Sequence, residues 1–289
     1  MDFLTVVKCM AALALVSLMF WMGLKAKFED VLSRSKNPKL LGIGCLANFV
    51  LVPMFTLGLL HVFSPGSMVS VGLLILAVCP GAPVGLPFVV IARGDVAFAI
   101  SQMIILSTLS VLFSPLLLGI LLNYWFQDDD LVIDYLAVMQ TLFLIQILPL
   151  GLGFLLHHFT PVFAERSMNT LGIISNLLLI ATVILILMAE YETLIRIRFQ
   201  DWLGMMIMYF GCLGLGWICG GSSRRFRNTF SITTGVRNAA IALVIVSNNF
   251  PGTPAVATVV AQSLLGIIGG VIFALFLGAM PDARTSHDS

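Results

Sequence analysis

Long apolar runs separated by short polar links dominate this chain of 289 residues. A helix of about 20 apolar residues crosses ~30 Å of hydrocarbon, so each run near this length is a candidate membrane span. Helices also satisfy their own backbone hydrogen bonds, as a span in lipid must. We predict nine spans, at residues 4–24, 38–63, 67–92, 95–124, 131–158, 168–190, 201–220, 226–248 and 254–280.

Composition supports a membrane protein. Hydrophobic residues make up 59% of the chain and charged residues 10%, and the mean hydropathy is +1.06. Such a chain has too little polar surface to coat a water-soluble globule. Because the links leave no room for a soluble domain, we predict an all-α polytopic membrane protein with residues 1–289 in one transmembrane domain.

Basic residues gather in alternate links. The odd-numbered links and the C-terminal tail carry them, whereas the fourth link carries acidic residues and no Lys or Arg. Since basic links face the cytoplasm, we predict a plasma or inner cell membrane protein with its N-terminus outside and its C-terminus inside. The sixth link is mixed, with Arg196 and Arg198 beside acidic residues. The basic residues of the odd-numbered links and the tail are Lys25, Lys27, Arg34, Lys36, Lys39, Arg93, Arg166, Arg224, Arg225, Arg227 and Arg284. The acidic residues of the fourth link are Asp128, Asp129, Asp130 and Asp134.

The first apolar run has a second interpretation. Lys8 precedes an apolar stretch with Ala12-Leu13-Ala14, a pattern also found in cleaved signal peptides. Asp2 and the continuation of the run to Leu24 favour a membrane span. The five cysteines lie within or at the ends of runs without a C-x-x-C pair, so we expect no disulfide framework and no metal site.

Two of the runs contain residues that interrupt a helix. Residues 79–87 include three prolines, and each proline removes a backbone donor and clashes with the preceding turn. Unwound backbone at membrane depth is tolerated where it is buried in protein or lines a polar cavity. We therefore predict a structural crossover here. Its residues are Pro80, Gly81, Pro83, Gly85, Leu86 and Pro87.

The second interruption carries a charge. Arg237 lies well inside the run 226–248, in a polar stretch that includes Thr233, Thr234, Gly235 and Asn238. A charged side chain in this position costs roughly 3 kcal/mol or more on insertion scales, so it normally marks a pathway or a ligand site.

The interrupted runs occupy matching positions in two halves of the chain. We predict a first repeat at 4–124 that lacks one helix and a second repeat at 131–280, with opposite orientations. Paired discontinuous helices in inverted repeats are typical of secondary transporters with a site near the membrane midplane. Helix N-termini aimed at that site favour an anion.

Several motifs in their order along the chain resemble the bile acid:sodium symporter family. The resemblance covers nearly the whole chain and implies a panel of outer helices, a core in which the two broken helices cross, and transport by alternating access. The chain looks like the nine-helix form of the family. The motifs are Asn37-Pro38-Lys39, Pro53, Pro80-Gly81, Arg93-Gly94-Asp95-Val96-Ala97, Ser107-Thr108-Leu109, Ser114-Pro115-Leu116, Leu148-Pro149-Leu150-Gly151-Leu152-Gly153 and Gly235-Val236-Arg237-Asn238.

The residues that bind sodium in the family are largely replaced. By the resemblance, Thr233 stands where sodium-coupled members have a carboxylate, and Arg237 where they have a glutamine. Gly85-Leu86 replaces Ser-Asn, and an amide in the second span is kept as Asn48. Two further hydroxyl ligands would fall on Ala99 and Met103. Because sodium needs several oxygen ligands, these replacements argue against sodium coupling.

We therefore expect the Arg237 guanidinium to act as a fixed substitute for the coupling ion. A planar guanidinium suits a carboxylate or bicarbonate-like anion in bidentate geometry. An alternative is a structural plug, in which Arg237 satisfies the carbonyls of the broken helix. Ser107, Thr108, Ser110 and Ser114 are expected to bond back to their own helix. The expected substrate-binding residues are Arg237, Asn238, Thr233, Thr234, Asn48, Gly81, Gly85 and Leu86.

The sequence thus predicts a secondary transporter of a small organic or inorganic anion in a lipid bilayer. The alternatives are a sodium-coupled symporter of organic anions and a membrane sensor that does not transport. We find no catalytic motif and no His or carboxylate pair inside a run, so we expect neither an enzyme nor a cofactor. A net charge of +1 does not indicate a nucleic-acid partner, and the pattern indicates no particular oligomer.

Overall fold

The computed structural model describes residues 3–25, 38–126, 134–195 and 197–280, and these are helical with short connections. Lys27, Arg34, Lys36, Asp128 to Asp130, Arg196 and Arg284, named above for their charge, lie outside the described residues. The elements are α1 (Phe3–Lys25), α3 (Pro38–Leu46), η1 (Ala47–Leu51), α4 (Val52–Phe63), α5 (Ser67–Ala77), η2 (Pro83–Gly85), α6 (Leu86–Ile91), α7 (Val96–Trp125), α8 (Tyr135–Leu142), η3 (Phe143–Ile147), α9 (Leu148–Phe159), α10 (Pro161–Ile195), α11 (Phe199–Cys219), α12 (Arg224–Gly235), α13 (Ala239–Asn249) and α14 (Pro254–Ala279).

The described helices coincide with the predicted apolar runs. Seven segments among these residues are long and apolar enough to cross a membrane. Two shorter apolar helices, Cys9–Lys25 and Ser67–Ala77, fall in the first and third runs. The prediction of an all-α, multi-pass membrane protein is confirmed, whereas the division into two inverted repeats stays a prediction.

Both predicted interruptions are present. After α5 the backbone leaves the helix at Val78 and resumes in the single turn of η2, with Pro83 at its start and Pro87 in the first turn of α6. Prolines are tolerated in first turns because the N–H they lack would have no helical partner there. The second interruption is shorter, since α12 ends at Gly235 and α13 begins at Ala239.

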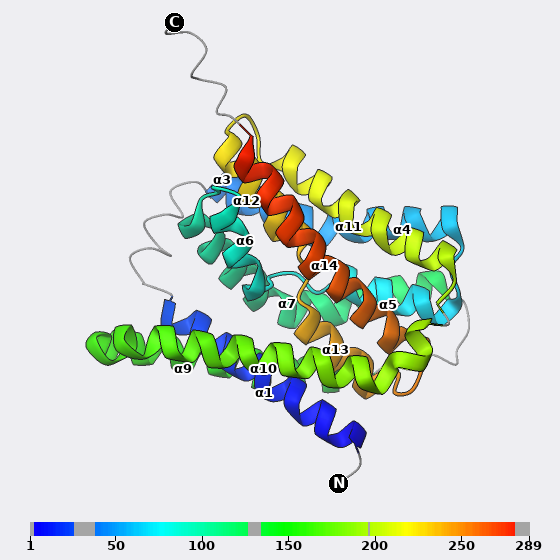
Figure 1. Cartoon of the computed structure of the whole chain (residues 1–289), viewed down its shortest axis with the longest axis horizontal. Helices are drawn as coiled ribbons and strands as arrows, with labels where there is room; N and C mark the ends of the chain where they lie inside the picture. Colours follow the sequence, from blue (N-terminus) through cyan, green and yellow to red (C-terminus); the bar gives the residue numbers. More distant parts are fainter. Residues whose placement is uncertain (1–2, 26–37, 127–133, 196, 281–289) are drawn as a thin grey trace, which may run out of the picture.

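Three helices form an outer layer, which we define as α1, α9 and α10. Figure 1 shows them together along the lower edge of the molecule, with the remaining helices above them. Gly23 of α1 faces the Leu150 carbonyl of α9, and Gly153 of α9 faces the Phe20 carbonyl of α1, without room for a Cβ at either position. Ala14 and Leu15 of α1 are fully buried, which favours the membrane-span interpretation of the first run.

Two of the long helices contain a widened turn just before a proline. In η1 the Val52 amide bonds to the Ala47 carbonyl, and in η3 the Leu148 amide bonds to the Phe143 carbonyl, so each turn is π-helical. Pro53 and Pro149 follow directly. A wider turn accommodates a proline ring that would otherwise clash with the preceding carbonyl. Each turn also contains a fully buried amide side chain, Asn48 in η1 and Gln146 in η3.

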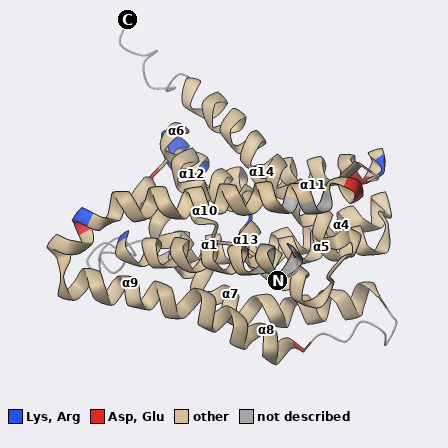
Figure 2. Ribbon diagram, turned by 60° about the horizontal axis from the view of Figure 1, so that its bottom comes forward, with Lys and Arg blue, Asp and Glu red and all other residues tan. Residues whose placement is uncertain are grey.

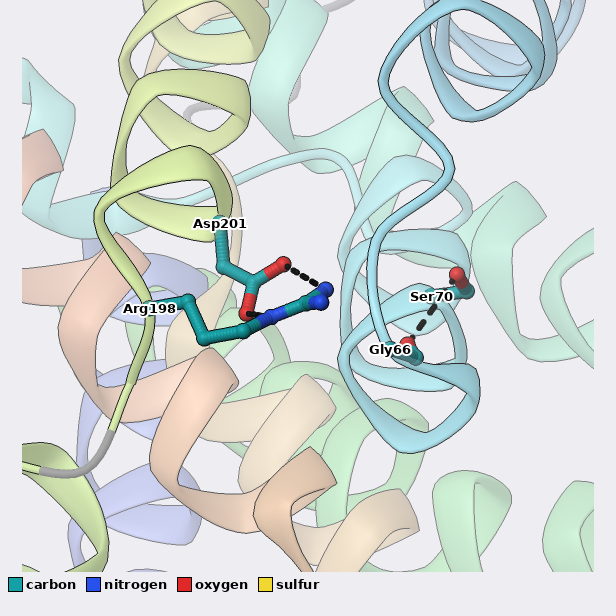
Figure 3. Close-up of polar contacts among 4 residues, drawn as sticks. All are labelled: Gly66, Ser70, Arg198 and Asp201. Carbon is teal, nitrogen blue, oxygen red and sulfur yellow. Dashed lines mark hydrogen bonds and ion pairs between the residues drawn. The ribbon is translucent and has the colours of Figure 1, made fainter.

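Apart from Arg237, the charged residues of the described helices gather at the two ends of the bundle (Figure 2). At one end, Asp95 accepts from the Phe98 amide to cap α7 and lies 3.7 Å from Arg225 of α12. At the other end, Arg198 donates from Nε and Nη2 to Asp201, both at 3.1 Å, on the side that faces Gly66 and Ser70 (Figure 3). The bonds and the attraction to Asp201 raise the pKa of Arg198.

Candidate functional site

The two helix breaks touch each other. The Asn238 backbone amide donates to the Cys79 carbonyl at 2.8 Å, and Asn238 Nδ2 donates to the Gly81 carbonyl at 3.2 Å. Asn238 Oδ1 accepts from the Ile241 amide at 3.3 Å and so caps the start of α13. One asparagine therefore begins the second half-helix and attaches it to the first break.

The Arg237 guanidinium lies at the C-terminal end of α5. Nε donates to the Leu76 carbonyl at 3.1 Å, and Nη2 donates to the Ala77 carbonyl at 2.6 Å. Both carbonyls lie in the last turn of α5, which ends at Ala77, and the Leu76 carbonyl also accepts from the Cys79 amide at 3.1 Å. The end of a helix where carbonyls point outward carries partial negative charge, which stabilises a cation.

Oxygens from two other elements complete the surroundings of Arg237. Nη1 donates to Asn48 Oδ1 at 2.6 Å and to the Thr234 carbonyl at 3.4 Å. The guanidinium is therefore enclosed by four neutral oxygens, and Arg237 is only 7% exposed. No carboxylate pairs with it in the part of the chain that the structure describes.

These bonds bear on the two roles expected for Arg237. A guanidinium has five N–H donors. Four have acceptors here, which leaves one N–H on Nη2 without an acceptor among the described residues. The contacts with Leu76 and Ala77 are those of a structural plug. A bidentate ligand needs two free N–H groups, so in this conformation an anion would interact with Arg237 mainly through its charge.

Asn48 and Thr234 belong to the same polar group. Asn48 Nδ2 donates to the Gly44 carbonyl at 3.0 Å and to Thr234 Oγ1 at 3.4 Å. With its oxygen on Arg237, the Asn48 amide connects the second span to the end of α12 and to the second break. The prediction brought Asn48, Thr234 and Arg237 together, and the structure places them in contact.

Thr233 turns toward another partner. Its hydroxyl donates to Gln102 Oε1 of α7 at 3.1 Å. Gln102 is buried, its Nε2 has no acceptor among the described residues, and it packs so closely on Gly44 that a Cβ there would overlap it. The sequence analysis missed Gln102, although it is a polar residue inside an apolar run. The neighbouring residues of α7, Ala99 and Met103, are buried and supply no side-chain oxygen.

Serines of α7 support the first break. Gly81 has φ +78°, and its carbonyl accepts from Ser107 Oγ at 2.9 Å, while Ser114 Oγ donates to the Val78 carbonyl. Ser110 bonds back to the Ser107 carbonyl at 2.8 Å, as expected. The expectation of back-bonding was wrong for Ser107 and Ser114, because the break presents carbonyls without helical partners, and these compete for the hydroxyls.

Gln146 is a second residue that the sequence analysis missed. From η3, its Nε2 donates to the Ser107 carbonyl and to Ser110 Oγ, the latter at 3.0 Å. Its Oε1 is buried and has no partner in the described part of the chain. This amide connects η3, the turn between α8 and α9, to α7, whose serines bond to the first break. A polar residue three positions before Pro149 in an apolar run was the available signal.

Two cavities flank the crossing of the breaks. The larger, of about 450 Å³, lies between the outer layer and helices α6 and α7, and its lining includes Trp21, Lys25, Leu86 and Pro87. The smaller, of about 30 Å³, is lined by Gly235, Arg237 and residues of α10, α11 and α14. The predicted site residues are thus divided, because Leu86 lines the large cavity whereas Arg237 lines the small one. Gly85 lies against Met103, where a Cβ would come within 3.0 Å of Cε.

A comparison with protein families decides the class. The model of the Sodium Bile acid symporter family matches residues 12–197, which include the first break and end before the second. The chain belongs to this family.

Curated relatives of the family agree over most of the chain. The probable sodium/metabolite cotransporter BASS2, chloroplastic, of Oryza sativa subsp. japonica is 26% identical over 90% of this chain and 61% of its own length. The uncharacterized sodium-dependent transporter YocS of Bacillus subtilis is 19% identical over 88% and 79%. The ileal sodium/bile acid cotransporter of Oryctolagus cuniculus is 23% identical over 98% and 82%. The chain thus spans less than two thirds of the rice relative. These names describe transporters and not enzymes.

Proposed function

We propose that this protein is a secondary transporter that moves a small organic or inorganic anion, of the carboxylate or bicarbonate-like class, without coupling to sodium. One observation carries the proposal. The Arg237 guanidinium is enclosed by four neutral oxygens at the point where the two helix breaks meet. We propose that this fixed charge takes the place of a mobile coupling cation and stabilises the substrate anion.

The enclosure of Arg237 supports the absence of sodium coupling. A hard cation binds a set of carbonyl and amide oxygens at membrane depth, and the guanidinium already occupies such a set here. A second cation 4 Å away would be repelled by roughly 4 kcal/mol at an effective dielectric constant near 20. Beside Thr233, Gln102 Oε1 already accepts a hydrogen bond from the Thr233 hydroxyl at 3.1 Å, and neither side chain carries the negative charge that a hard cation usually requires.

The charge of Arg237 supports an anionic substrate. A buried charge without a counter-ion is costly, and no described carboxylate neutralises this one. An anion that reaches the crossing would gain roughly 4 kcal/mol at 4 Å under the same dielectric conditions. Guanidinium does not lose its proton in proteins, so Arg237 cannot carry a coupling proton. We therefore infer that the anion is transported by facilitated movement or by anion exchange.

The layers and cavities support alternating access. The large cavity separates the outer layer from the core helices α6 and α7 at the bundle end that contains Lys25. We propose that this end faces the cytoplasm, with the N-terminus outside, in a plasma or inner cell membrane. Movement of the core against the outer layer would then expose the crossing to each side in turn.

Uptake into proteoliposomes tests the proposal. The purified full chain is reconstituted, and uptake of labelled small carboxylates and bicarbonate is measured with an inward sodium gradient and with choline in its place. We expect saturable uptake with equal initial rates in both conditions and acceleration by unlabelled substrate inside the vesicles. Uptake that requires the sodium gradient would overturn the sodium-independent mechanism.

A sodium-coupled symporter of organic anions is the second candidate, favoured by relatives named as sodium/metabolite or sodium/bile acid cotransporters. The sodium gradient in the same assay separates the two mechanisms. A membrane sensor would bind the anion in a thermal-shift measurement and show no counterflow. Transport itself is therefore decided by the counterflow result, independently of its coupling.

A further inference from the structure

The small cavity beside Arg237 contains polar groups that the site described above does not use. Its volume is about 30 Å³, and its walls come from the two breaks, from α11 and from α14. Leu179 and Val183 of α10 close the side toward the outer layer. The cavity therefore lies on the interface that must open when the core and the outer layer move apart.

Two buried side chains of this cavity have unpaired polar atoms. Among the described residues, the Tyr209 hydroxyl of α11 and Gln262 Oε1 of α14 have no hydrogen-bond partner, and the two residues are 3% and 4% exposed. Leaving such a group unpaired costs about 1–3 kcal/mol, so native proteins seldom keep one without a purpose. Ser263, their neighbour in the lining, is satisfied by the Val259 carbonyl.

The Tyr209 ring packs against a glycine of α14. Gly269 of α14 leaves a notch for the ring, because a Cβ at this position would lie 2.7 Å from Tyr209 Cε1. A side chain confined in this way positions its hydroxyl at little entropic cost. The Tyr209 side chain is thus held in the lining of the cavity that Arg237 also lines, although no described group bonds to its hydroxyl.

The volume of the small cavity and the polar groups in its lining together indicate that it receives a polar group of a ligand. A cavity of about 30 Å³ holds one water, which can bridge polar atoms until a ligand displaces it. The guanidinium supplies charge, the tyrosine supplies a hydroxyl, and the glutamine supplies an amide that both donates and accepts. An anion with a hydrogen-bonding group next to its carboxylate satisfies all three.

We propose that Tyr209 and Gln262 determine substrate specificity by contacting a polar substituent beside the carboxylate held near Arg237. This inference rests on the proposed function, since it requires an anion at the crossing. A site that hydrogen-bonds a substituent discriminates strongly against analogues without it, because its own polar groups then stay unpaired. The transporter accordingly prefers 2-hydroxycarboxylates to the corresponding unsubstituted acids.

Competition between lactate and propionate tests the inference in proteoliposomes. We expect wild type to prefer lactate and Tyr209→Phe to lower the ratio of lactate to propionate kcat/KM about tenfold, mainly through lactate. Gln262→Leu should act in the same direction. Tyr124→Phe, at a 60% exposed position of α7, removes a hydroxyl elsewhere and should leave the ratio unchanged.

A charged variant at position 262 keeps the inference falsifiable if Tyr209→Phe and Gln262→Leu fold poorly. Gln262→Glu places a carboxylate in the cavity, where it would neutralise Arg237 and compete with the substrate, so uptake of both acids should fall at least tenfold. Unchanged selectivity in Tyr209→Phe and Gln262→Leu, or full uptake by Gln262→Glu, would overturn the specificity role and leave anion transport intact. Failure of wild type to transport any carboxylate would instead overturn the proposed function, and this inference with it.

Discussion

The backbone amide of Asn238 donates a hydrogen bond to the carbonyl of Cys79 at 2.8 Å. This bond joins the two interrupted helices, and Asn238 Nδ2 adds a second bond, to the Gly81 carbonyl. Because both bonds use groups that the breaks expose, each break satisfies part of the other. In the proposed mechanism, the crossing therefore moves as one unit.

Arg237→Gln tests the fixed charge. We expect loss of the guanidinium to raise KM for the anion at least tenfold, because the roughly 4 kcal/mol attraction at 4 Å is removed. By resemblance to sodium-coupled members, a glutamine here also opens the oxygen set to a cation, so residual transport should become sensitive to sodium. Initial uptake rates with sodium and with choline measure both effects. Unaltered, sodium-independent kinetics would remove Arg237 from the mechanism.

Arg237→Lys separates charge from geometry. An ammonium keeps the positive charge but is a compact point donor that cannot reach all four oxygens at once. We expect anion uptake to persist with a modestly raised KM and a lower melting temperature in detergent. If this variant loses uptake as completely as Arg237→Gln, charge alone does not explain the role.

Gly81→Ala should destabilise the first break. A left-handed φ is unfavourable for alanine by about 1–2 kcal/mol, and the added Cβ would lie 2.8 Å from the Ser107 amide nitrogen. Gly42→Ala is the matched control, since a Cβ there meets no atom within 4 Å. We expect a clear drop in thermal stability for the first variant and none for the second. Equal melting temperatures would show that the break tolerates a side chain.

The fold was predicted well because the features that determine it, apolar run length and prolines, can be recognised within short stretches of sequence. Apolar run length fixed the spans, and prolines fixed the first break, since Pro80, Pro83 and Pro87 cannot continue a helix. The π-helical turns before Pro53 and Pro149 were not predicted. They depend on how each proline ring is accommodated within a longer helix, and run length carries no such information.

Gln146→Leu tests the contact between η3 and α7. Removing the amide breaks its bonds to Ser107 and Ser110 and also removes an unpaired oxygen, so we expect little change in stability. Because the bond joins helices that shift against each other in the proposed mechanism, kcat should change by several-fold while KM stays constant. Gln140→Leu, at an exposed position of α8, is the control and should leave both unchanged. A change confined to KM would contradict this role.

Gly153→Ala should loosen the outer layer. The new methyl group would overlap the Phe20 carbonyl of α1, and backbone atoms cannot move aside, so overpacking should cost about 1–3 kcal/mol. Gly151→Ala in the same helix meets nothing within 4 Å and serves as the control. Thermal unfolding in detergent compares them. Equal stability would mean that α1 and α9 tolerate separation.

The candidate site was harder to predict than the fold. Arg237, Asn48 and Thr234 were found because polar residues in apolar runs are conspicuous, and their contact follows from the crossing of the breaks. Gln102 and Gln146 were equally polar but stood outside the motifs. The division of Arg237 and Leu86 between two cavities depends on helix packing across distant segments, which spacing along the chain does not encode.

The glycine contact between α1 and α9 has a consequence for biogenesis. As the ribosome delivers the chain, α1 reaches the bilayer before α9, yet the groove that receives Gly23 is on a helix around Gly153, 130 positions later in the sequence (153 − 23). Until that helix arrives, the exposed backbone of α1 must be shielded by lipid or by the insertion machinery. A mutation at Gly153 would therefore reduce yield during synthesis before it affects the finished transporter.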